Sequence, residues 1–230
     1  MRRALTALLL LAPATALAAE RKLFLSSFER LRVDGPFRVT VTTGRSPAGV
    51  VTGDPHRLDG VEVRQEGATV YVRRDAARAD EPRGDEPVTV ALATPALAAV
   101  NVIGPGAVSV AGMKARRIDL SVSGTGSIAV AGADAAELHA TTVGTGRIAV
   151  AGRTGRARLL VNGAGGVDAA KLDAGEITVR LDGPGEVAAR ARFTAAVTNG
   201  GLGRITVAGP AKCRVAAGGG PVTCEGGIGR

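Results

Sequence analysis

A Gly-x-Gly motif returns about every twenty residues through the second half of this chain. Five copies are Gly104-Pro105-Gly106, Gly124-Thr125-Gly126, Gly144-Thr145-Gly146, Gly163-Ala164-Gly165 and Gly183-Pro184-Gly185, and weaker copies follow at Gly201-Leu202-Gly203 and Gly218-Gly219-Gly220. A fixed period of this length is typical of a solenoid, in which each repeat is one coil stacked on the coil before it. The period therefore constrains the architecture of this chain more than any other feature.

Apolar residues occupy fixed positions on both sides of each glycine. Four residues after the first glycine of a copy the side chain is Val or Ile, and six residues after it the side chain is Val or Ala. The run before the glycine alternates in the same way, and alternation with a period of two indicates a strand with one buried face. The column four residues after the glycine contains Val108, Ile128, Ile148, Val167, Val187 and Ile205.

These columns predict an all-β fold, a parallel β-helix with about seven glycine-cornered coils. Successive coils would lie about 4.8 Å apart, as paired strands do, and would share one aliphatic core. Aromatic residues make up only 2% of the chain and Trp is absent, which suits a narrow interior filled with Val, Ile, Leu and Ala. The glycines would serve corners where φ is positive or where close packing between coils excludes a Cβ.

The N-terminus has the features of a secretory signal peptide. Met1-Arg2-Arg3 is followed by a mostly apolar stretch, and Ala16-Leu17-Ala18 fits an A-x-A cleavage site. We therefore expect residues 1–18 to be a signal peptide and the mature protein to be periplasmic or extracellular. Residues 19–95 are expected to form an N-terminal β segment that starts the solenoid and covers its open end. Residues 96–230 are expected to form the parallel β-helix repeats.

The first half of the mature chain has no twenty-residue repeat but retains β character. Alternating segments predict strands at residues 31–33, 37–41, 61–63, 69–72 and 88–92. Glu66-Gly67 predicts a hairpin between the third and fourth of these strands. The polar segment from Ala76 to Glu86, interrupted by Pro82, predicts a mobile loop.

Cys213 and Cys224 lie eleven residues apart on either side of the last glycine turn. In an oxidising compartment an even pair indicates a disulfide first, here one that pins the terminal coil. Both residues extend inward columns, because Val215 and Val222 stand two positions away from them. Metal binding is the weaker alternative, because two thiols without a nearby His fall short of a zinc site. No metal or other cofactor is expected.

The net charge of +8 does not by itself indicate a nucleic-acid partner. The basic residues are scattered among acidic ones, without a basic run or interleaved aromatic residues, which is typical of a solvated surface. Export also argues against nucleic acid as a target. After the signal peptide, no stretch approaches the roughly 18 apolar residues that a transmembrane helix requires.

The sequence contains no strong catalytic motif. The glycine copies open strands rather than helices and lack a Gly-Lys-Ser/Thr ending, so they are not nucleotide-binding loops. His56 and His139 are the only histidines; His139 is expected at an exposed polar position and His56 in a turn. A Ser-His-Asp arrangement is the alternative for them, but no nucleophile-elbow motif supports it. The closest approach to a polar patch is formed by Asn162, Asp182 and Glu186, beside the turns of two neighbouring coils, with Asp168 on an outward position. A close carboxylate pair there would suit a polysaccharide-cleaving enzyme, but scattered surface acids are the default interpretation.

The mature chain resembles the GIN-domain family of auto-transporter adhesin head domains. The resemblance is carried by the block from Phe28 to Val41, by Gly53-Asp54, by Leu58-Asp59-Gly60-Val61 and by repeats such as Gly124-Thr125-Gly126-Ser127-Ile128. It covers nearly all of the mature chain, and it implies an exported right-handed β-helix of bacterial type. The family name suggests adhesion.

The leading hypothesis is a non-enzymatic binding, adhesion or scaffold module of the bacterial cell envelope. Small residues such as Ala111, Ala131 and Ala151 would pack flat against an envelope protein, a glycan or another copy if they face outward. The alternative is a carbohydrate-active enzyme that works on an envelope polysaccharide. The identity of the ligand and the oligomeric state do not follow from the sequence.

Overall fold

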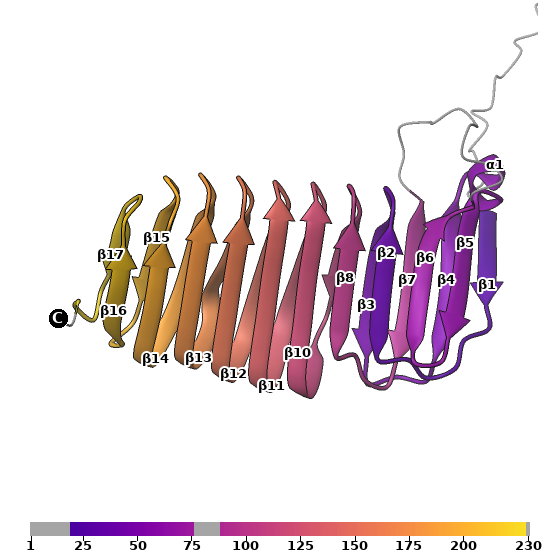
Figure 1. The fold of residues 1–230 in the computed structure, drawn as a ribbon. Coiled ribbons are helices and arrows are strands. Elements are labelled where there is room, and N and C mark those ends of the chain that lie inside the picture. Colours follow the sequence, from indigo (N-terminus) through magenta and orange to yellow (C-terminus); the bar gives the residue numbers. More distant parts are fainter. Residues whose placement is uncertain (1–18, 76–87, 229–230) are drawn as a thin grey trace, which may run out of the picture.

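The computed structural model describes residues 19–75 and 88–228. The fold is nearly all-β, with 71% strand and 2% helix, and its parallel strands stack into a β-solenoid of about 6 turns (Figure 1). The predicted fold class is therefore confirmed. The predicted signal peptide (1–18) and the loop predicted from Ala76 to Glu86 lie outside the described residues.

The described chain contains seventeen strands and one short helix, which starts at Pro55 (Figure 1). In chain order they are β1 (Ala19–Leu23), β2 (Arg30–Asp34), β3 (Arg38–Thr43), β4 (Ala48–Gly53), α1 (Pro55–Leu58), β5 (Val61–Glu66), β6 (Thr69–Arg74), β7 (Thr89–Thr94), β8 (Ala99–Ile103), β9 (Ala107–Val110), β10 (Met113–Gly124), β11 (Ser127–Gly144), β12 (Arg147–Asn162), β13 (Gly166–Asp182), β14 (Glu186–Asn199), β15 (Arg204–Ala208), β16 (Lys212–Ala217) and β17 (Val222–Cys224).

Each coil contributes to two main sheets that meet at the glycine corner. We call the strand segments that precede the corner the front sheet and those that follow it the back sheet. The long strands β11 to β14 belong to both, because each begins in the back sheet, bends, and ends in the front sheet. In β11, for example, Ile128 pairs with Val108 in the back sheet, whereas Leu138 pairs with Ile118 in the front sheet. A short third segment, such as residues 133–135, connects the two and does not follow from the sequence columns.

The predicted inward columns form one continuous core. All members of the column four residues after the glycine are at most 2% exposed. The columns six residues after the glycine, four residues before it and six residues before it are also buried, with one exception, Ala98, at the start of the repeats. Ala98 is half-buried there and its neighbour Leu97 is fully buried, because β8 begins only at Ala99.

The corner glycines are required by the close approach of successive coils. A Cβ on Gly126 would lie 2.5 Å from the carbonyl oxygen of Gly106 and 2.7 Å from that of Gly104. Gly124 has a φ of +109°, a conformation that favours glycine. Backbone hydrogen bonds also join the corners, as between the Gly146 nitrogen and the Gly124 oxygen at 2.8 Å. Both predicted reasons for the glycines are therefore confirmed.

The N-terminal end of the stack departs from the repeat pattern. β2 pairs in parallel with β6 on one side and with β8 on the other. It therefore lies between two strands that follow it in the chain, and not at the end of the stack. The strands β1, β4 and β5 then run antiparallel to their neighbours, and the predicted hairpin joins β5 to β6. The Arg21 guanidinium donates hydrogen bonds to the carbonyl oxygens of Leu58, at 3.1 Å, and Val61, at 2.6 Å. We call β1, β4, α1 and β5 the N-terminal cap.

The C-terminal coil is closed by the predicted disulfide. Cys213 and Cys224 are joined by an S–S bond of 2.05 Å between β16 and β17. Cys213 lies in register with Ala195 and Cys224 with Val207, so both sulfurs extend inward columns as expected. The disulfide therefore links the front and back sheets across the core.

Candidate functional site

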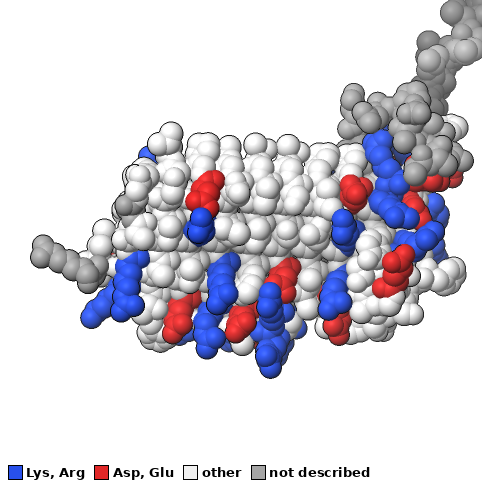
Figure 2. All heavy atoms as spheres, in the orientation of Figure 1, with Lys and Arg blue, Asp and Glu red and all other residues white. Residues whose placement is uncertain are grey.

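Charged side chains concentrate along one edge of the repeat stack (Figure 2). Ion pairs join side chains of successive coils there, as between Arg153 Nη2 and Asp134 Oδ2 at 2.8 Å and between Arg156 Nη1 and Glu137 Oε1 at 3.4 Å. The hydrogen bond from Arg153 lowers the pKa of the Asp134 carboxyl and raises the pKa of the arginine. These pairs are exposed, so we interpret them as a solvated edge.

The back sheet carries a shallow trough of about 470 Å³ across its outer surface. It extends over β3, β9, β11, β12 and the start of β13. Parallel pairing places outward residues of successive coils in straight rows, and one such row along the trough is Thr40, Ser109, Ala129, Ala149 and Asp168. Most of the side chains in this row are small.

The predicted small-residue positions lie in this trough. Ala111 and Ala131 are exposed and Ala151 is half-buried, and all three line the trough. These alanines therefore face outward, as packing against a partner requires. Asp168 and Lys171 provide the only ionisable side chains among the lining residues. The trough is thus a flat, mostly uncharged surface with one charged end.

The four predicted polar-patch residues do not gather at one place. Asn162 and Asp182 end front-sheet strands and lie in register in neighbouring coils. Asp168 and Glu186 lie in the back sheet, in different rows. Asp182 Oδ2 accepts a hydrogen bond from Arg180 Nε at 2.7 Å, and Asp168 Oδ1 accepts one from the Ala170 nitrogen at 3.1 Å. The structure therefore divides these carboxylates between two faces.

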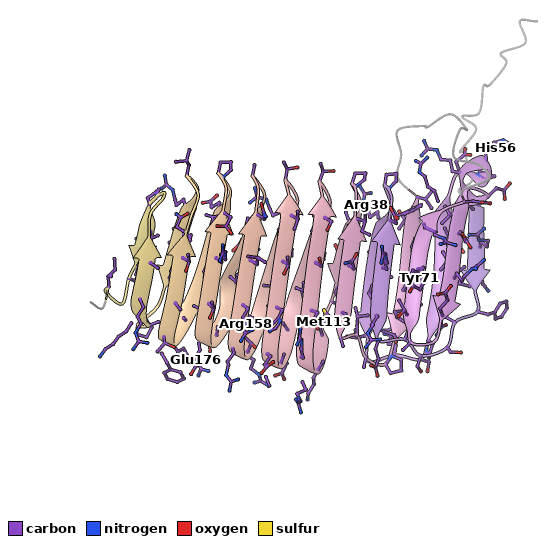
Figure 3. The ribbon with its side chains drawn as sticks, in the orientation of Figure 1. Arg38, His56, Tyr71, Met113, Arg158 and Glu176 are labelled. Carbon is purple, nitrogen blue, oxygen red and sulfur yellow. A yellow bond between two sulfur atoms is a disulfide. The ribbon has the colours of Figure 1, made fainter. Side chains whose placement is uncertain are left out.

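His139 is outward but half-buried, and His56 lies in the short helix α1 rather than in a turn. His139 lies in register between Asp119 and Arg158 on the front sheet, where Arg158 is labelled in Figure 3. Its Nδ1 is 3.7 Å from Asp119 Oδ1. His56 belongs to α1 at the N-terminal end of the molecule, and its backbone nitrogen donates to Asp54 Oδ1 at 2.9 Å. Neither histidine is placed beside a nucleophile by these contacts.

Sequence reasoning did not identify Thr40, Thr42 and Lys171 as part of the trough. The two threonines come from β3, which precedes the twenty-residue repeats. A usable signal is Gly35, which stands four residues before Val39 as Gly104 stands four residues before Val108, and these two valines pair in register. Within residues 19–75 and 88–228, no group of three His, Cys, Asp or Glu residues is arranged to bind a metal ion. No helix in the same residues has the length and apolar character needed to cross a membrane.

Solved structures with the same fold come from several bacteria. A putative adhesin from Bacteroides fragilis has a TM-score of 0.78 at 17% identity, covering 94% of this chain and 96% of that one. A putative adhesin from Parabacteroides merdae has a TM-score of 0.71 at 18% identity, covering 90% and 95%. A putative lipid binding protein from Parabacteroides distasonis has a TM-score of 0.68 at 18% identity, covering 92% and 95%. At these identities the likeness concerns the fold alone.

No curated protein matches this chain. The model of one family does match, however, over residues 27–211, which include the N-terminal strands β2 to β7 and nearly all of the repeats. That family is described as the putative auto-transporter adhesin, head GIN domain. Its name and those of the Bacteroides fragilis and Parabacteroides merdae neighbours are names of adhesins, not of enzymes. This chain belongs to the family of auto-transporter adhesin head GIN domains.

Proposed function

We propose that this protein is an exported, non-enzymatic adhesion module of the bacterial cell envelope, and that it binds its partner through the trough of the back sheet. The trough supports this proposal because it combines a flat surface with accessible methyl and hydroxyl groups on a rigid stack. Flat packing against such a surface needs no side-chain rearrangement, so little conformational entropy is lost on binding. Family membership supports adhesion as the general role.

A glycan strand of the envelope is the partner class that we favour. The trough offers hydroxyl groups from Thr40, Thr42 and Ser109, and the charged end contributes Asp168 and Lys171. The hydroxyls at one end of the trough and the charged groups at the other can hydrogen-bond to a sugar chain, while the methyl groups between them contact the apolar faces of its rings. An envelope protein with a flat surface is the other partner class. No similar gathering of side chains supports a glycan-cleaving activity, because the candidate carboxylates are divided between two sheets.

The experiment measures binding of the purified, fluorescently labelled chain to peptidoglycan sacculi and to vesicles that contain lipopolysaccharide. The variant Ala131→Arg fills the middle of the trough and should lower saturable binding by about tenfold or more. The matched control is Ala196→Arg, because Ala196 is an exposed alanine on the front sheet of the same stack. Binding that is lost equally in both variants, or in neither, would contradict the trough as the contact surface.

Release of soluble sugar fragments during the same incubation provides the test of the rival enzyme. We expect none from the wild-type chain. Turnover that disappears in the double variant Asp182→Asn and Glu186→Gln would instead establish a carbohydrate-active enzyme and overturn the proposal.

A further inference from the structure

An uncharged strip crosses the front sheet between two Arg-x-Asp pairs. Arg32 and Asp34 bound the strip in β2, and Arg180 and Asp182 bound it in β13. Register pairing places the two arginines in one outward row and the two aspartates in the adjacent outward row. Figure 2 shows the strip as a white band between two places where an acidic side chain lies directly above a basic one.

The middle of the strip exposes apolar side chains. Four coils separate the bounding pairs, and their outward residues in these two rows carry no charge. Val143 is 47% exposed and Leu160 is 37% exposed, although both belong to the regular part of the stack. Thr141 lies beside both residues, since it pairs in register with Leu160 and precedes Val143 by two positions. Apolar side chains rimmed by charges in this way are a feature of association surfaces.

We propose that this strip binds a second copy of the same strip, about a two-fold axis that runs along the stacking direction between the two rows. Such a rotation exchanges the two rows and leaves the order of the coils unchanged. Arg32 then lies opposite the partner's Asp34, and Arg180 opposite the partner's Asp182, with the reciprocal pairs formed as well. The contact is isologous, because each copy contributes the same residues.

The alternative two-fold axis, parallel to the strands, brings like charges together. It would reverse the order of the coils and place Arg32 opposite the partner's Arg180 and Asp34 opposite the partner's Asp182. Like charges directly opposite each other oppose association, so charge complementarity selects the first axis. That axis also places Thr141 opposite the partner's Val143 at the centre, where the apolar groups are buried.

The size of the strip predicts a weak dimer. Five steps of about 4.8 Å separate the bounding pairs, so the strip with its side chains covers roughly 450 Å² on each copy. The total of about 900 Å² is below the roughly 1,200 to 2,000 Å² of most stable interfaces. The two copies should therefore exchange readily, and the dimer should be concentration-dependent.

Sedimentation equilibrium of the purified chain, up to about 1 mM, tests the proposal because weak association appears only at high concentration. The wild type should shift from monomer to dimer. Asp182→Arg places two arginines opposite each other and should weaken dimerisation by about tenfold or more. The double variant Arg180→Asp and Asp182→Arg restores opposite charges in every pair and should restore dimerisation.

The matched control is Asp134→Arg, which makes the same charge change at another exposed ion pair, on the charged edge. It should leave dimerisation unchanged, and circular dichroism should show that all variants remain folded. A wild type that stays monomeric throughout, a double variant that is no better than Asp182→Arg, or a control as weak as Asp182→Arg would each overturn the proposal. The trough lies on the other sheet, so these results are independent of the proposed function.

Discussion

The N-terminal cap and the repeat stack close the same core by different means. In the stack, each parallel coil is covered by the next, and the corner glycines allow their backbones to approach closely. In the cap, antiparallel strands and specific side chains cover the N-terminal end of the stack. Arg21, for example, hydrogen-bonds to backbone oxygens in and next to α1. Backbone geometry thus determines how the core is covered in the stack, whereas individual side-chain contacts determine how it is covered by the cap. The following predictions test this difference.

Glycine substitutions should show the largest difference between the two regions. In the stack, Gly126→Ala should cost about 3 kcal/mol in the free energy of unfolding, because the new Cβ would lie 2.5 Å from a backbone oxygen that cannot move away. In the hairpin next to the cap, Gly67 has a φ of +56°, and a Cβ built on it meets no described atom within 4 Å. Gly67→Ala should therefore cost only about 1 kcal/mol, from backbone strain alone. Urea denaturation of both variants measures the two values, and equal losses would contradict the account.

Loss of the disulfide should be the next largest effect and should be confined to the C-terminal end. Replacing Cys213 and Cys224 with alanine should lower the free energy of unfolding by about 2 to 3 kcal/mol, as expected for a closed loop of this length. Hydrogen exchange should accelerate in β16 and β17 while the cap keeps its protection. Faster exchange that spreads equally to β1 and β4 would show that the two ends are not independent.

Two buried threonines should respond in opposite directions when they are changed to valine. Near the cap, Thr94 Oγ1 donates to the Phe28 oxygen at 2.6 Å and accepts from the Phe28 nitrogen at 3.3 Å. Thr94→Val leaves those backbone groups without a partner and should cost about 1 to 3 kcal/mol. In the stack, Thr142 Oγ1 is buried without a hydrogen-bond partner among the described residues, so Thr142→Val should stabilise the protein by about 1 kcal/mol.

Thermal unfolding of the two threonine variants measures both effects against the wild type. A melting temperature that falls in Thr94→Val and rises in Thr142→Val is the expected result. A loss of stability in both variants would mean that the Thr142 hydroxyl makes a stabilising hydrogen bond in solution.

The smallest effects concern the exposed ion pairs. The hydrogen bond from Arg73 lowers the pKa of Glu62 in the cap, and that from Arg153 lowers the pKa of Asp134 in the stack. A folded-state pKa below the unfolded value adds stability above the unfolded pKa, and this stability is lost as the pH falls through the folded pKa. Protonation of both carboxylates should therefore destabilise the fold slightly in acid, below about pH 4.

NMR titration of the two carboxyl groups provides the measurement. Arg73→Ala should raise the pKa of Glu62 and leave that of Asp134 unchanged, and high salt should move both towards their ordinary values because the pairs are exposed. A salt-independent pKa at either residue would indicate a buried pair instead.

The stack is far more predictable from sequence than the cap, for physical reasons. Every coil of the stack needs apolar residues at the same distances from its corner glycine. Residues of one column, such as Ile128 and Ile148, can therefore be aligned from the period of the sequence alone. β1 is rich in charged residues and β4 contains glycines, so neither shows the alternation that identifies a strand. Their pairing comes from long-range contacts rather than from a local pattern.

The candidate site was predictable only in part. Outward alanines could be named from the period, because alternation assigns each residue to one face. The trough also depends on β3, whose Thr40 reaches its place through a parallel pairing with β9 that skips the intervening strands. Asn162, Asp182 and Glu186 were grouped by their nearness to the corners in sequence, and Asp168 was added as an outward residue. A corner separates two sheets, so residues just before and just after it, such as Asp182 and Glu186, lie on different sheets although they are near in sequence.

The central claim is that successive coils stack in register with one strand spacing per repeat. Distances between spin labels in one back-sheet row test it directly, with Ser109→Cys paired in turn with Ala188→Cys and Thr206→Cys. Four and five register steps separate these positions, so label distances should be about 19 Å and about 24 Å. Distances that do not increase by about one strand spacing per repeat would contradict the stacked solenoid.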